Sequence, residues 1–185
     1  MKMKPKERLI DNALKLFRQR GFYATGVDTV LAEAKVSKTT LYRHFRSKEE
    51  LIIAVLRRQD EEFRNWFMKT VDQASKQPLE KLLSVFDVYQ KWAEQDDFNG
   101  CAFVKASAEF PCPESPIHAL CVEHKRLMTR YIQELAETAH VPDANNIATQ
   151  FMLLLDGATV LAQMTGKVQT FGEAKDYARK IVFQN

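Results

Sequence analysis

Two short helical patterns joined by a tight break, within residues 27–45, constrain the fold of this chain more than any other feature. In the first pattern, apolar residues recur at helical spacing and predict one buried face: Val27, Val30, Leu31 and Ala34. A turn is expected at residues 35–37, followed by a short helix at about 38–44 that is anchored by Leu41 and Phe45. With an amphipathic helix predicted before them, the two helices indicate a three-helix domain of the helix-turn-helix type.

The outward face of the 38–44 helix is crowded with hydrogen-bonding and basic side chains. They are Lys38, Thr39, Thr40, Tyr42, Arg43 and His44. Lys38 can donate to guanine O6 and N7 or to phosphate, and the two threonines offer hydroxyl and methyl groups suited to thymine. Arg43 either reads a base or faces solvent. A helix with one apolar side and one such polar side fits the major groove of DNA.

Start and stop signals place the neighbouring helices. Pro5 opens the first helix and Gly21 ends it. Thr25 is predicted to be the N-cap of the next helix. Ser47 and Glu50 form a capping box that opens a long fourth helix.

The remainder also reads as helix, because no segment alternates apolar and polar residues long enough to make a strand. After a break at Gln77-Pro78, further helices are expected at about residues 79–93, 101–110, 117–139, 144–166 and 171–183. The proline-rich segment 111–116 is predicted to be a loop. The centre of the 144–166 helix is apolar nearly all round, which indicates burial by the core and by a second subunit.

The predicted fold class is therefore all-α. An N-terminal three-helix helix-turn-helix domain is expected at residues 4–56, with the long linking helix starting at about residue 47. A larger helical domain for ligand binding and dimerisation is expected at residues 57–185.

Charge is distributed unevenly along the chain. Residues 1–58 carry 14 Lys or Arg against 6 Asp or Glu, a balance of +8, whereas the remainder carries 13 against 18, a balance of −5. A basic head on an acidic body indicates that only the head meets a polyanion. This asymmetry argues against an architectural protein that would coat DNA along its whole length.

The order Val-Ser-Lys-Thr-Thr-Leu-Tyr-Arg-His-Phe-Arg-Ser-Lys-Glu-Glu-Leu, at residues 36–51, resembles the DNA-binding domain of TetR-family transcriptional regulators, and the match covers about residues 6–56. The resemblance implies a variable, all-helical body that binds a small molecule and forms a homodimer through its last two helices. It also implies phosphate contacts for Tyr42 and His44, although packing inside the domain is an equal alternative for Tyr42. The predicted DNA-binding residues are Thr25, Ser37, Lys38, Thr39, Thr40, Tyr42, Arg43, His44 and Lys48.

Two positions depart from the family pattern. Lys35 stands where the family usually has glycine, so either a left-handed lysine costs on the order of 1 kcal/mol there or the turn has a different shape. Thr39 stands where the family often has glycine, and its larger side chain at the groove surface is expected to change base preference.

The body is rich in aromatic residues, which form either an ordinary core or the walls of a pocket for an apolar or aromatic ligand. Asp156 is a lone carboxylate in a very apolar helix and needs a partner: a ligand cation, a basic side chain or a subunit contact. The candidate ligand-binding residues are Trp66, Phe67, Phe86, Tyr89, Trp92, Phe103, Cys121, His124, Phe151 and Asp156.

The three cysteines have no metal-type spacing, so reduced thiols that pack as small hydrophobes are expected. His118, Cys121 and His124 follow one another in steps of three, but the two histidines lie about 120° apart on a helical wheel, so no metal site is predicted. A thiol switch is the alternative, using Cys101 at a helix start or Cys112 between prolines.

The sequence thus predicts a ligand-responsive, sequence-specific regulator of transcription that is released from a palindromic operator by a small apolar or aromatic effector. The resemblance implies that it is a repressor. An oxidant- or electrophile-sensing regulator that uses Cys101 or Cys112 is the alternative. An all-helical enzyme has the least support, because none of the common catalytic motifs is found. No cofactor is predicted, and the absence of a signal peptide or of an apolar run of about 20 residues indicates a cytoplasmic protein.

Overall fold

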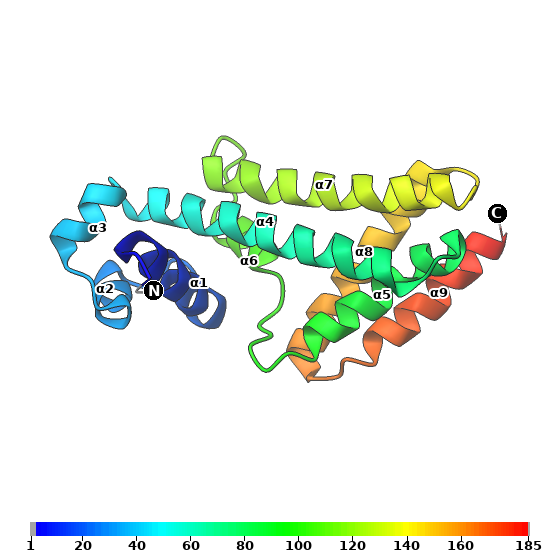
Figure 1. Cartoon of the computed structure of the whole chain (residues 1–185), viewed down its shortest axis with the longest axis horizontal. Helices are drawn as coiled ribbons and strands as arrows, with labels where there is room; N and C mark the ends of the chain where they lie inside the picture. The colour runs from blue at the N-terminus through cyan, green and yellow to red at the C-terminus, as the bar shows by residue number, and fades with distance from the viewer. Residues whose placement is uncertain (1–2, 185) are drawn as a thin grey trace. The chain divides into compact units, whose positions relative to one another are not determined.

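The computed structural model describes residues 3–184, and these residues form α-helices and no strand (Figure 1). The helices are α1 (Pro5–Arg20), α2 (Val27–Ala34), α3 (Lys38–His44), α4 (Lys48–Ala74), α5 (Pro78–Ala93), α6 (Ala102–Glu109), α7 (Pro116–Thr138), α8 (Ala144–Thr165) and α9 (Thr170–Gln184). The all-α fold class is confirmed. Pro116, predicted to lie in a loop, is instead the first residue of α7, a position where proline's missing N–H costs nothing.

The described residues divide into two compact units. The first comprises the chain up to Glu62 together with Ala102–His124. The second comprises Phe63–Cys101 together with the chain from Lys125 onward. Both α4 and α7 contribute residues to each unit.

In the first unit, α1, α2 and α3 pack around a small apolar centre. Leu9, Phe17 and Leu41 are fully buried there, and the Phe17 ring stacks on Phe22 with centroids 4.9 Å apart. Gly21 ends α1 with φ +89°, where an L side chain is strained, and its N–H donates to the Phe17 carbonyl. The local signals therefore shape this unit much as the sequence predicts.

The start of α4 differs in one detail from the predicted capping box. The Glu50 N–H donates to Ser47 Oγ at 3.2 Å, as expected. The Glu50 carboxylate, however, accepts from the N–H of Arg46 at 2.7 Å, one residue earlier than the reciprocal bond of a capping box requires. Ser47 is still the residue that starts the helix.

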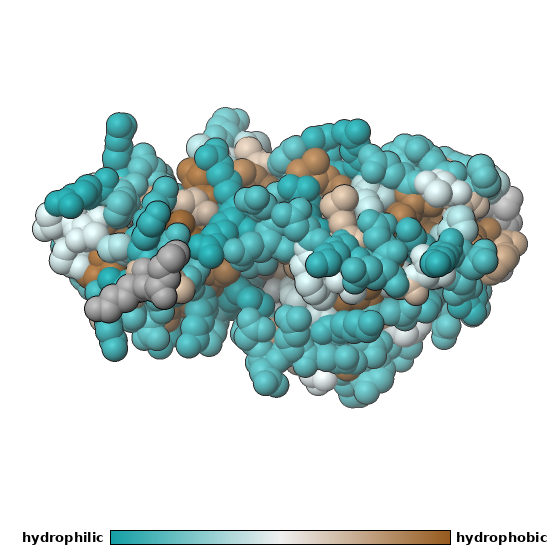
Figure 2. All heavy atoms as spheres, in the orientation of Figure 1, coloured by the Kyte–Doolittle hydropathy of each residue, from teal (hydrophilic) through white to brown (hydrophobic). Residues whose placement is uncertain are grey.

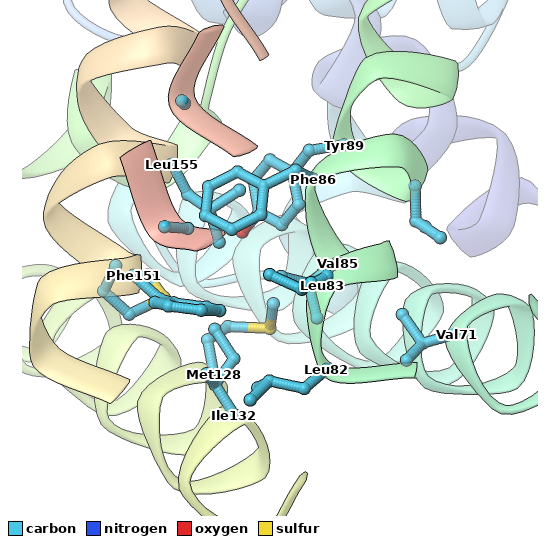
Figure 3. Close-up of a cluster of buried hydrophobic side chains, with 14 of the residues drawn as sticks. Val71, Leu82, Leu83, Val85, Phe86, Tyr89, Met128, Ile132, Phe151 and Leu155 are labelled. Atoms are coloured by element: carbon cyan, nitrogen blue, oxygen red, sulfur yellow. The ribbon is translucent and has the colours of Figure 1, made fainter. Parts of the chain in front are cut away.

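The second unit is built around one apolar core to which α4, α5, α7, α8 and α9 all contribute. Figure 3 shows Phe86 of α5 and Phe151 of α8 as neighbours in this core; their ring centroids lie 5.1 Å apart and the ring planes are tilted by 59°. Beside them, α8 and α9 pack against each other as a helical hairpin (Figure 1). On the face drawn in Figure 2, hydrophilic side chains dominate, and apolar atoms show mainly between them, as expected for helices with one buried stripe.

Helix α8 is unusually apolar. Within the described part of the chain, it alone is long and apolar enough to cross a membrane by length and composition, and 44% of its most apolar window is buried. The expectation that no apolar run reaches this length is therefore wrong for α8. Core helices of soluble proteins meet the same criterion.

Candidate nucleic-acid interface

The outward face of α3 carries the side chains predicted to meet DNA. Leu41 points into the unit and is fully buried, whereas Tyr42 is 47% exposed. Lys38, Thr39, Arg43 and His44 are also exposed. Lys38 lies 3.8 Å from the Asp28 carboxylate, but both side chains are so exposed that this ion pair holds the lysine weakly.

Ser37 and Thr40 fix the start of α3. The Thr40 N–H donates to Ser37 Oγ at 3.2 Å, so Ser37 is the N-cap of the helix. The two hydroxyl groups also lie 2.9 Å apart. Their first role is therefore to shape the end of the helix that presents Lys38 and Thr39.

The turn between α2 and α3 is strained at Lys35. This residue has φ 51° and ψ 50°, the left-handed conformation that the family pattern fills with glycine. Its N–H donates to the Ala32 carbonyl, and the N–H of Val36 donates to the Leu31 carbonyl. Of the two alternatives for this turn, a left-handed lysine or a turn of different shape, the structure has the left-handed lysine.

Thr25 does not cap α2, contrary to prediction. The N-cap is Gly26, without a side-chain hydrogen bond, and the Thr25 side chain is buried. Its hydroxyl donates to the carbonyl of Gly21 at 2.7 Å, and the Leu16 carbonyl lies 3.4 Å away. The hydroxyl thus ties the turn to the end of α1, a contact that spacing within α2 cannot reveal.

Lys48 begins α4 and reaches back to the same turn. Its Nζ donates to the Tyr23 carbonyl at 3.2 Å. Burial lowers the pKa of Lys48 from its ordinary value, and the nearby Glu109 carboxylate partly offsets this effect. Glu109 accepts from the Phe22 and Tyr23 N–H groups, yet no local signal in the sequence singles it out, because 86 or 87 residues separate the partners.

Three of the candidate ligand-binding residues lie in the first unit and already have partners. The His124 ring is buried, with Nδ1 2.7 Å from Asp60 Oδ1, and it stacks on Phe103 with centroids 3.7 Å apart. Cys121 Sγ donates to the Ile117 carbonyl. Among the described residues, no group of three His, Cys, Asp or Glu side chains could hold a metal ion.

The other candidates lie in the second unit, where most of them form an aromatic cluster. Tyr89 is at its centre: it meets Phe63, Phe67 and Trp92 edge to face, with centroids 5.3–5.9 Å apart. Burial, followed by the electrostatic effect of Asp156, raises the pKa of Tyr89 well above its ordinary value. Phe86 and Phe151 pack in the same core.

Asp156 has a basic partner rather than an unfilled site. Lys125 Nζ donates to its carboxylate, and both side chains are partly exposed. Of the alternatives left open by the sequence, the basic side chain is therefore the one that the structure provides.

Two open hollows lie on the surface of the second unit. One, of about 430 Å³, is lined by Asp176, Arg179, Lys180 and Phe183. The other, of about 410 Å³, is lined by Arg126, Thr129, Arg130, Gln133 and Asn145. None of the ten candidate ligand-binding residues lines either hollow.

Comparisons with known proteins identify the family of this chain. Residues 9–55 match the family model of the bacterial regulatory proteins of the tetR family, and residues 78–178 match that of the tetracyclin repressor-like C-terminal domain. The chain is 26% identical over 152 residues to the HTH-type transcriptional regulator YjdC of Escherichia coli, covering 82% of this chain and 80% of that protein.

Solved structures show the same fold. A TetR-family transcriptional regulator from Streptomyces coelicolor, SCO4454, superposes with a TM-score of 0.89 at 27% identity, covering 96% of this chain and 95% of that one. The reduced form of Escherichia coli NemR superposes with a TM-score of 0.84 at 21% identity, covering 95% of each chain. Family and relatives are regulators rather than enzymes. The chain belongs to the TetR family and is a DNA-binding regulator of transcription.

Proposed function

We propose that this regulator is a repressor that binds a palindromic operator as a homodimer and is released by a small apolar or aromatic effector. The exposed, N-capped face of α3 carries the proposal, because it presents donors and a cation on a helix whose other face is buried. The curated relative NemR of Escherichia coli, 28% identical over 105 residues and 56% of this chain, is named a transcriptional repressor.

The residues of the interface would make two kinds of contact, with base edges and with phosphates. Lys38, Thr39 and Arg43 are exposed and suited to base edges, whereas Tyr42 and His44 are suited to phosphates. The Thr25 hydroxyl already bonds the Gly21 carbonyl, and the Lys48 ammonium bonds the Tyr23 carbonyl. Thr25 would therefore bind phosphate through its backbone N–H group, and Lys48 through its backbone N–H group or its charge. Residues 4–56 would then form the DNA-binding domain, and residues 57–185 the effector-binding and dimerisation domain.

Helices α8 and α9 would form the dimer interface. Large apolar side chains remain exposed on them: Leu153, Val160, Leu161 and Met164 on α8, and Tyr177 and Phe183 on α9. The four on α8 share one face at helical spacing, and exposed Gly157 leaves open space in their midst. TetR-family regulators act as dimers, and a patch of this kind on a protein proposed to be cytoplasmic indicates a protein partner.

The aromatic cluster of the second unit would receive the effector. Phe63 and Phe67 belong both to this cluster and to α4, the helix that begins with Lys48 directly after the α3 segment. A ligand that alters their packing therefore acts on the helix that follows the DNA-binding residues. Release requires only that the ligand prefers the conformation with low operator affinity.

Selection of DNA by the purified protein tests this function. Sequencing of duplexes recovered from a random pool should give inverted half-sites about one helical turn apart, or a multiple of it. Their affinity should fall steeply with salt. A motif without symmetry, or no enrichment, would contradict the proposal.

A fluorescence titration extends the test to the effector. Both tryptophans, Trp66 and Trp92, lie in or against the cluster, so aromatic compounds that release the operator should also change tryptophan fluorescence. Release with unchanged fluorescence would place the effector elsewhere.

A thiol-sensing regulator is the second candidate function, favoured by the exposure of Cys112. Its thiol donates to Glu114 at 3.0 Å in the loop directly after Phe110, whereas Cys101 is partly buried. If peroxide or an electrophile releases the operator from the wild type but not from C112S, with C101S as the matched control, this alternative replaces effector binding.

A further inference from the structure

The turn between α1 and α2 is held by a carboxylate from far along the chain. Glu109, the last residue of α6, accepts from the N–H of Phe22 at 2.9 Å through Oε1 and from the N–H of Tyr23 at 2.6 Å through Oε2. Both acceptor oxygens of one ionised side chain are thus used on two consecutive backbone donors. Such charge-assisted hydrogen bonds are about twice as strong as neutral ones.

Two neighbours of Glu109 extend the contact. One helical turn earlier on α6, Lys105 donates its Nζ to the Arg18 carbonyl at 2.7 Å. The Phe110 ring stacks on Tyr23 with centroids 4.7 Å apart and meets Phe22 edge to face. A cation therefore meets a carbonyl at the end of α1, and an anion meets the two N–H groups that follow.

Gly21 shows how closely the carboxylate approaches. A Cβ atom at this position would lie 2.9 Å from Glu109 Oε1, closer than real Cβ contacts allow. A side chain at residue 21 would therefore be strained by the positive φ and would also displace the Glu109 carboxylate.

The turn leads directly into the DNA-binding helices. Inside it, the Thr25 hydroxyl bonds the Gly21 carbonyl, and Lys48 at the start of α4 bonds the Tyr23 carbonyl. Helix α2 begins at Val27, immediately after these contacts. The orientation of α2, and of α3 after it, therefore depends on a turn whose N–H groups are bound by Glu109 of α6.

We propose that Glu109 is a positioning residue for operator binding, and that α6, through Glu109, Lys105 and Phe110, sets the orientation of the α2–α3 pair. Displacement of α6 frees the two N–H groups and lowers operator affinity without any change in the residues that touch DNA. This inference rests on the proposed contacts of α3 with a two-half-site operator.

The test compares E109Q and E109A with the wild type, using fluorescence anisotropy on the operator duplex recovered by selection and on a random duplex of equal length. Glutamine keeps the shape but turns one of the two acceptors into a donor. The matched control is E61Q, which removes the same charge from an exposed position of α4 in the same unit. K38A/Y42A serves as the control for the α3 contacts.

We expect E109Q to weaken operator binding about tenfold, and E109A by more, because a charge-assisted pair of hydrogen bonds is lost. Affinity for the random duplex should stay within about twofold of the wild-type value, since sequence-independent phosphate binding depends little on the orientation of the α2–α3 pair. Hydrogen exchange at the Phe22 and Tyr23 amides should quicken, and E61Q should behave as the wild type.

The inference would be overturned if both Glu109 variants bound the operator as tightly as the wild type. It would also be overturned if affinity fell equally for the operator and for the random duplex, because such a result would indicate general misfolding. Should E109A fail to fold, the isosteric E109Q decides. If K38A/Y42A also binds the operator normally, the proposed function fails; if only that variant loses binding, the positioning role of Glu109 alone is wrong.

Discussion

Different interactions stabilise the interior of each of the two units. In the first, polar side chains clasp backbone groups at each turn: Thr25 and Lys48 bond carbonyls, whereas Ser37 and Glu109 accept from N–H groups. In the second, rings pack on rings around Tyr89, with few polar groups inside. A binding surface needs the first kind of order, because directional hydrogen bonds fix backbone orientation, whereas apolar contacts supply stability without direction.

The largest expected effect lies in the second unit. Phe86→Ala removes a fully buried ring that packs on Phe151, and should cost about 3–5 kcal/mol of unfolding free energy. Chemical denaturation followed by the fluorescence of Trp66 and Trp92 measures it. Val122→Ala, at a position that is 56% exposed, should change stability by less than about 0.5 kcal/mol. Equal effects of the two changes would remove the contrast between core and surface.

A smaller effect is expected at the buried turn of the first unit. Thr25→Val keeps the shape but loses the hydroxyl that bonds the Gly21 carbonyl, which should cost about 1–2 kcal/mol. Circular dichroism during denaturation measures the loss. An unchanged free energy of unfolding would show that the hydrogen bond from Thr25 to Gly21 does not stabilise this turn.

Replacement of the strained lysine should stabilise the protein. Lys35→Gly relieves the left-handed φ of 51°, and we expect a gain of about 0.5–1 kcal/mol. Lys35→Gln removes the same charge but keeps the strain, and should therefore match the wild type. A gain in both variants would mean that charge, rather than backbone geometry, limits this turn.

Alkaline pH should lower the free energy of unfolding through Tyr131, a residue of the second unit. Near neutral pH, Tyr131 should have no such effect. Burial, followed by the charge of Asp72, raises the pKa of Tyr131 above its ordinary value of 10.0. Above pH 10 the unfolded chain releases the proton that the folded chain retains, so the contribution is complete below that pH and is lost as pH rises. Tyr131→Phe should reduce the alkaline loss of stability in denaturation curves between pH 9 and pH 11; an identical pH profile would contradict this.

Sequence reasoning succeeded where the cause of structure is local. The bounds of α3, Lys38–His44, were predicted because Leu41 and the break at Lys35 lie within a few residues of one another. It failed where the partner is distant in the chain. The Thr25 hydroxyl bonds the end of α1, Glu109 reaches Tyr23, and Asp156 meets Lys125. Nothing in a local pattern reports such pairs, so the surface proposed to meet DNA can be predicted from the sequence, whereas the distant residues that bond its turns cannot.

The most direct measurement is the operator affinity of the K38A/Y42A double variant. Both side chains are exposed on α3, so their removal should leave the thermal unfolding of the protein unchanged. We predict a loss of operator affinity on the order of 100-fold, together with a shallower dependence on salt, because contacts are lost in both half-sites. A correctly folded, dimeric double variant that binds the operator as tightly as the wild type would contradict the assignment of α3 as the surface that reads DNA.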